Sequence, residues 1–157
     1  MATPSTLADR GSLLRYEDHE EIQPAERLLF LFQELADWID GTLVYQPRIR
    51  GRDLTPLEQV EALFHDFVYT KDFTGVGHFV NIMPQGDGVY EMKTPDVRVF
   101  GWFYQTAQFV AHSGALKKDI KRTRAVDRIR REVVQARSRL NLDQPAFIRS
   151  SRIHELI

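Results

Sequence analysis

Apolar residues in the first half of the chain recur mainly at helical spacing. Pro24 suits a first helical position and Gly41 a left-handed stop, so a helix is predicted over about 24–40. Its apolar stripe would consist of Leu28, Leu31, Phe32, Leu35 and Ile39. The tetrapeptide 55–58 (TPLE) is a capping box with proline just inside the start, and it opens a second predicted helix that ends near Val68. We expect the two helices to form an antiparallel hairpin.

Strand-like patterns replace helical spacing in the second half. Runs at 89–93, 97–104 and 108–112 are rich in Val, Phe, Trp and Tyr and are separated by turn residues, which predicts an antiparallel meander. Alternation places Glu91 and Lys93 on one face of the first strand. One face of the second strand carries Arg98, Phe100, Trp102 and Tyr104, and the other carries Val97, Val99 and Phe103. Either face can be the inward one at this level.

A last helix is predicted from about Arg124 to Leu140. The order of elements indicates an α+β fold, with an N-terminal helical hairpin packed on a small antiparallel sheet of about three to four strands and with a basic C-terminal helix. The chain is interpreted as a single domain, 1–157. Its expected parts are a mobile start (1–11), the helical hairpin and acidic half (12–87), the meander with the basic helix (88–140) and a loosely docked tail (141–157).

Charge is divided unevenly along the chain, although the formal net charge is only −1. Residues 1–87 carry seven Lys and Arg against fifteen Asp and Glu, whereas residues 88–157 carry fourteen against seven. Between Lys117 and Arg139 the count is ten against three. Such asymmetry indicates nucleic acid or an acidic partner for the basic half. The alternative is that the basic face merely neutralises the acidic half within one fold.

Several functional classes lack their sequence signatures. No apolar run is long enough to span a membrane, and the first residues carry acids without an apolar segment typical of a secretory signal, so a cytoplasmic protein without a membrane partner is expected. The chain has no cysteine, no HExxH, no GxSxG and no P-loop signature. We therefore expect no metal and no cofactor.

Cations and aromatic residues interleave around the predicted meander. Ammonium and guanidinium groups suit phosphates and rings suit bases, so this combination is typical of proteins that bind single-stranded nucleic acid. The residues in question are Glu91, Lys93, Arg98, Trp102, Tyr104, His112, Lys117 and Lys118.

The same stretch resembles a known family. The segments GDGVYEMK, RVFGWF and FVAHSGALKKD, between Gly86 and Asp119, are similar to the RelE/ParE/HigB superfamily of toxin–antitoxin toxins, in particular the phage-derived HigB-like branch. That branch typically shows a Glu-Leu-Arg strand, an Arg-Val-Phe strand and a hydrophobic strand that ends in Lys-Lys before a helix. Two features depart from it: Lys93 stands where the family prefers arginine, and the first half is longer, with an extended inter-helix loop and a glycine-rich segment at 70–87.

The resemblance implies metal-independent endoribonuclease activity on mRNA, often on the ribosome, and neutralisation by an acidic antitoxin-like protein partner. In that chemistry the ribose 2′-OH attacks the adjacent phosphate. Arg98, Lys93 and Lys117 or Lys118 would stabilise the phosphorane, and His112 or Glu91 would act as general base or acid. RNA-binding roles would fall to Trp102, Tyr104, Lys118, Lys121, Arg122, Arg124, Arg128 and Arg131.

Two other functions remain open on the sequence. A non-catalytic phage or prophage protein could use the basic helix to grip a host protein or nucleic acid. A gyrase-directed toxin, like the ParE branch, is the third possibility.

Overall fold

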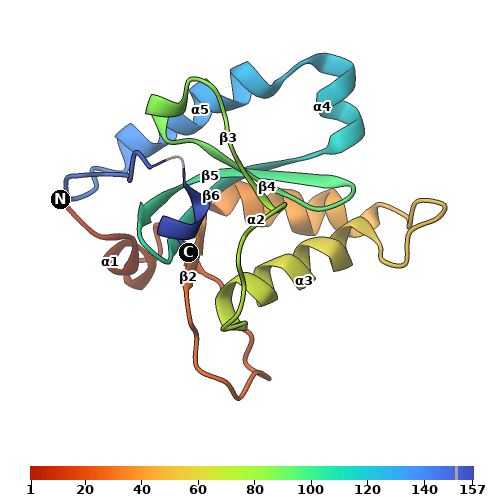
Figure 1. Cartoon of the computed structure of the whole chain (residues 1–157), viewed down its shortest axis with the longest axis horizontal. Coiled ribbons are helices and arrows are strands. Elements are labelled where there is room, and N and C mark those ends of the chain that lie inside the picture. Colours follow the sequence, from red (N-terminus) through yellow and green to blue (C-terminus); the bar gives the residue numbers. More distant parts are fainter. Residues whose placement is uncertain (151) are drawn as a thin grey trace.

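The computed structural model describes residues 1–150 and 152–157, and within them it shows one six-stranded mixed sheet with five α-helices (Figure 1). The strands are β1 (Leu14–Arg15), β2 (Leu28–Leu31), β3 (Phe79–Asn81), β4 (Tyr90–Lys93), β5 (Val97–Gln105) and β6 (Gln108–Leu116). The helices are α1 (Pro4–Asp9), α2 (Gln33–Gly41), α3 (Pro56–Tyr69), α4 (Lys117–Thr123) and α5 (Val126–Arg139).

The sheet has the strand order β1-β2-β6-β5-β4-β3. Strands β3 to β6 form an antiparallel meander, in which β5 and β6 are the longest pair. Strand β2 joins this meander in parallel with β6, with Phe30 opposite Val110. Strand β1 then pairs antiparallel with β2 and ends the sheet.

Both faces of the sheet are covered by helices. Helices α2 and α3 pack on the first face, below the sheet in Figure 1, over a core that includes Phe103 and Phe109. Helix α5 packs on the second face, above the sheet, over a core that includes Phe100 and Trp102. Strands β2 and β5 are buried on both sides, so in β5 neither face is the outward one that the sequence left open.

The predicted fold was wrong in its sheet and in its hairpin. The sheet has six strands and is mixed, instead of three to four antiparallel strands, and no continuous helix spans 24–40. The first part of that segment is β2, and only Gln33–Gly41 is helical. The run Leu28–Leu31 is entirely apolar, which fits a helix face and a strand buried on both sides equally well. The segment forms a strand because it pairs with β6, and this pairing buries Phe30 in the second core and Leu29 in the first.

Helix α1, strand β3 and helix α4 have no counterpart in the sequence prediction. Helix α1 lies in the segment expected to be mobile, and its Leu7 is buried. Strand β3 lies in the glycine-rich segment, and α4 follows a β6 that runs four residues beyond the predicted end. The tail is tied to the sheet, since the backbone N–H of Ile148 donates to the Phe103 carbonyl and Leu156 is fully buried.

The predicted start of α3 and the predicted bounds of three later elements are confirmed. Helix α3 begins at Pro56, and the Thr55–Glu58 capping box is present in both directions. Strands β4 and β5 and helix α5 lie within one or two residues of their predicted bounds. Within the described ranges, no helix has the length and apolar character needed to cross a bilayer.

Candidate functional site

Three charged residues of β4 and β5 gather on the second face of the sheet. Lys93 lies directly opposite Arg98 in the ladder, and Glu91 lies opposite Phe100, which belongs to the second core. Residues paired across a ladder share a face, so all three side chains emerge on the side of α5. Three of the five catalytic candidates from the sequence are thereby brought together.

Arg98 is bound by its neighbours. Its Nε lies 2.6 Å from Glu91 Oε1, and its Nη1 donates to the carbonyls of Thr94 at 2.5 Å and Val97 at 2.9 Å. The two charged side chains are only 14% and 16% exposed. The guanidinium therefore braces the turn between β4 and β5 while it neutralises Glu91. Within the described residues, Nη2 donates no hydrogen bond.

Burial determines the acidity of Glu91. Removal from water raises the pKa of its carboxyl above the ordinary value, and the charges of Arg98 and Lys93 only partly offset this effect. A carboxyl with a raised pKa, held beside cations, is suited to take up and release a proton.

A β-bulge in β6 adds two polar side chains to this face. Phe100 faces Ser113 and Gly101 faces Ala111, so His112 is the extra residue. The His112 ring packs edge-on against Phe32 with centroids 4.8 Å apart, and burial lowers the pKa of its imidazole. His112 Nδ1 and Ser113 Oγ are buried and have no hydrogen-bond partner among the described residues. We call Glu91, Lys93, Arg98, His112 and Ser113 the strand-face cluster.

A buried polar network holds the same β4–β5 turn from the other side. The Gln59 side chain of α3 donates to Asp96 Oδ2 at 2.7 Å and accepts from the Thr94 hydroxyl at 2.9 Å and from the Asp96 backbone N–H at 3.0 Å. Arg52 adds an ion pair to Asp96 at 3.2 Å. These four residues form the turn network, which ties the turn to α3 and to the inter-helix loop.

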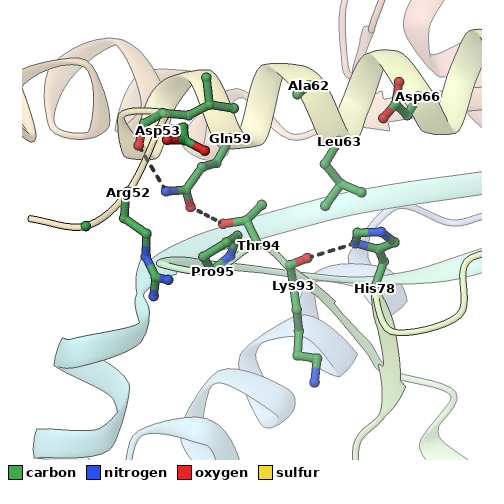
Figure 2. Close-up of a pocket in the computed structure, with 12 residues that line it drawn as sticks. Arg52, Asp53, Gln59, Ala62, Leu63, Asp66, His78, Lys93, Thr94 and Pro95 are labelled. Carbon is green, nitrogen blue, oxygen red and sulfur yellow. Dashed lines mark hydrogen bonds between the residues drawn. The ribbon is translucent and has the colours of Figure 1, made fainter. Parts of the chain in front are cut away.

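The turn network borders a cavity of about 380 Å³ between α3 and the β4–β5 turn (Figure 2). Figure 2 shows that the Lys93 side chain extends away from this cavity and contributes only its carbonyl, 3.3 Å from the His78 ring. The Lys93 side chain thus lies on the second face of the sheet, where Arg98 also lies.

A second pocket, of about 270 Å³, lies between the inter-helix loop and the start of α4. Its lining combines three lysines with an apolar wall and one carboxylate: Lys117, Lys118, Lys121, Pro47, Ile49, Pro56, Leu116, Gln46 and Asp96. We call it the lysine pocket. It contains the fifth catalytic candidate, Lys117, which is placed on a different element from the strand-face cluster.

The remaining predicted RNA-binding residues are scattered. Trp102 and Tyr104 are buried beneath the second-face elements, at 0% and 4% exposure, so bases cannot stack on them in this arrangement. Arg122, Arg128 and Arg131 are exposed but form ion pairs within their own helices. Arg124 is exposed and ends α4 in a left-handed conformation with φ 51°.

Sequence reasoning missed the arginines of the inter-helix loop. Arg48, Arg50 and Arg52 alternate within five residues, in a half of the chain that holds only seven Lys and Arg in total. That concentration of arginines in an otherwise acidic half could have identified the loop as a candidate binding segment.

No group of three or more His, Asp or Glu side chains within the described ranges is arranged to hold a metal ion. No family model, no curated protein and no solved structure matches the chain.

Proposed function

We propose that the chain is a toxin-like endoribonuclease that cleaves mRNA without a metal ion, by attack of the ribose 2′-OH on the adjacent phosphate. The observation that carries the proposal is the Glu91 carboxyl, held with a raised pKa 2.6 Å from Arg98 and on the same strand face as Lys93. A base beside two cations is what this reaction needs at one linkage.

In the proposed reaction, Glu91 takes the proton of the 2′-OH while the 2′ oxygen forms its bond to phosphorus. The bond to the 5′ oxygen then breaks and leaves a 2′,3′-cyclic phosphate. Arg98, through Nη2, and Lys93 stabilise the extra negative charge of the phosphorane. His112 donates a proton to the leaving 5′ oxygen when its imidazole is protonated.

The experiment is a cleavage assay of translated mRNA together with growth on expression. We expect the wild-type chain to cut mRNA and slow growth, and Arg98→Ala to lose both effects. Lys71→Ala, which removes an exposed lysine from the acidic half, is the matched control and keeps both. The proposal is wrong if the wild-type chain and Arg98→Ala are equally inert and equally harmless.

An acidic antitoxin-like protein is part of the same proposal. The exposed cations on α4 and α5 support such a partner, because opposite potentials speed and orient association. Co-expression with the partner would restore growth and would protect mRNA from the wild-type chain.

One observation favours a second candidate, a non-catalytic binding protein. Arg98 already neutralises Glu91 and braces a turn, which is what a purely structural ion pair would do. A pull-down that yields one stoichiometric protein partner, without any RNA cleavage, would favour this candidate.

A further inference from the structure

The lysine pocket is lined by different residues from those of the strand-face cluster. We propose that it binds one nucleotide unit of single-stranded RNA, with the base against the apolar wall and the phosphate on the lysines. This deepens the proposed function, on which it rests only for the claim that the bound RNA is also cut.

The charge around the pocket is strongly positive. The loop 46–52 and α4 together contain seven Lys and Arg and one carboxylate, Asp119. The cations are Arg48, Arg50, Arg52, Lys117, Lys118, Lys121 and Arg122. Asp96, the carboxylate in the pocket wall, is already engaged by Arg52 and Gln59. Within the described residues no carboxylate pairs with the three pocket lysines, so their ammonium groups remain for a phosphate.

The apolar wall distinguishes this pocket from a plain basic surface. Pro47, Ile49, Pro56 and Leu116 line it beside the lysines, and Ile49 is 42% exposed. A volume of about 270 Å³ lies just below the roughly 300 Å³ at which small-molecule pockets begin, which suits a single nucleotide and not a longer stretch. Tyr45, next to the lining residue Gln46, is 77% exposed and offers a ring for the neighbouring base.

The pocket and the strand-face cluster lie on two sides of one turn. Asp96 lines the pocket, and the Lys117 backbone N–H donates to the Asp96 carbonyl at 2.9 Å. From the other side, Arg98 holds the carbonyls of Thr94 and Val97. An RNA strand that passes this turn would place one nucleotide in the pocket and a neighbouring linkage at the cluster.

An acidic protein segment would satisfy the lysines equally well, but it would leave the apolar wall unused. RNA supplies both a phosphate and a flat apolar ring in each repeating unit. We therefore assign the pocket to RNA, and an acidic peptide enters the test as a competitor.

The test uses the full chain and a short 2′-O-methyl RNA, which binds but cannot be cut. Each contact with single-stranded RNA contributes a slope of about −0.7 to the dependence of log K on log salt, so the loss of two contacts in Lys118→Ala/Lys121→Ala lowers affinity about 25-fold at 0.1 M salt. The salt dependence becomes shallower by about 1.4 in the same measurement. Lys71→Ala is the matched control and binds like the wild type.

Methyl NMR reports on the apolar wall. Adenosine 5′-monophosphate is expected to shift the Ile49 and Leu116 methyl signals by its ring current, and inorganic phosphate is expected to leave them in place. The assignment is overturned if the nucleotide moves neither signal and the double variant binds RNA like the wild type. It is equally overturned if a deca-glutamate peptide binds the pocket while the RNA does not.

Cleavage of unmodified RNA separates the two proposals. If the wild-type chain cuts nothing but the double variant still loses RNA affinity and the methyl shifts occur, the pocket stands and the proposed function fails. If the chain cuts RNA and the double variant binds and cuts like the wild type, the function stands and the pocket assignment fails.

Discussion

At the scale of single residues, the ion pair between Glu91 and Arg98 stabilises the fold, and both of its members have a role in the proposed cleavage of RNA. Both partners are largely buried, so each prevents the other from standing as an uncompensated charge. Arg98 in addition satisfies two carbonyls of the β4–β5 turn, which ties the orientation of the guanidinium to the shape of that turn. Sequence alternation placed Glu91 with Lys93 on one face of β4 and Arg98 on one face of β5. The register between the two strands, the ion pair and the hydrogen bonds came only from the structure.

Removal of Arg98 tests the structural side of this pair. We expect Arg98→Ala to lower the free energy of unfolding by about 3 kcal/mol, because it strands Glu91 and frees two carbonyls. A double-mutant cycle with Glu91→Gln, followed by urea unfolding, would give a coupling of about 1–2 kcal/mol. Additive effects would mean that the pair contributes nothing as a unit.

His112 gives a pH-dependent contribution of definite sign. Burial lowers the pKa of its imidazole below the ordinary 6.5, so the folded chain disfavours the charged form. Above pH 6.5 the ring is neutral in both states, and the native state loses stability as the pH falls from 6.5 through the lowered pKa.

Urea unfolding between pH 4 and pH 8 checks this sign. The stability of the wild type should decline relative to His112→Gln only on the acid side. A constant difference across the whole range would show that His112 titrates as it does in the unfolded chain.

At the scale of elements, close packing between β5 and β6 leaves Gly101 without room for a side chain. A Cβ at this position would lie 2.0 Å from the Val110 carbonyl oxygen, a backbone atom that cannot rotate away. We expect Gly101→Ala to destabilise the fold by about 3 kcal/mol, in the upper range for overpacking. Thermal unfolding measures this loss.

Gly41 is the matched control for that substitution. It ends α2, and a Cβ there would meet nothing within 4 Å. Gly41→Ala should stabilise the chain by about 0.5 kcal/mol, because alanine restricts the unfolded chain more than glycine does. Equal losses in the two variants would contradict the packing described for β5 and β6.

Elements whose start and amphipathic pattern are encoded in neighbouring residues were predictable from the sequence. Elements whose conformation depends on contacts with residues far away in the chain were not. The capping box and the amphipathic spacing of α3 are local, and they fix its start at Pro56. The run Leu28–Leu31 acquires its strand conformation from β6, about 80 residues away in the chain. In the same way, Trp102 is placed in a core because distant elements, α5 among them, cover the second face.

At the scale of the whole molecule, the structure shows how the basic residues of the second half are used. Part of the basic excess is used internally: Arg130 pairs with Asp87, and Arg137 stacks on Phe147 and donates to the Asp87 carbonyl. The three lysines of the lysine pocket form no ion pair within the described residues and remain for a partner. The candidate site was therefore predictable only in part. The sequence singled out Glu91, Lys93, Arg98 and His112 as candidates, but it did not show that the inter-helix loop of the acidic half lies against α4 and forms the lysine pocket.

Two opposing pKa changes predict the pH optimum of the proposed activity. Glu91 must be ionised to act as base, and its pKa lies above the ordinary 4.5. His112 must be protonated to act as acid, and its pKa lies below 6.5. The rate should therefore pass through a maximum between the two shifted pKa values and fall on both sides. A rate that rises steadily to pH 9 would exclude His112 as the acid.

The most direct measurement of the central claim is the chemistry of the RNA ends that the chain produces. In the presence of EDTA, the wild-type chain should convert RNA to fragments with 2′,3′-cyclic phosphate ends, and Glu91→Gln should slow this by about 10²–10⁴-fold. Intact RNA, ends without a cyclic phosphate, or equal rates for the wild type and Glu91→Gln would contradict the proposed function.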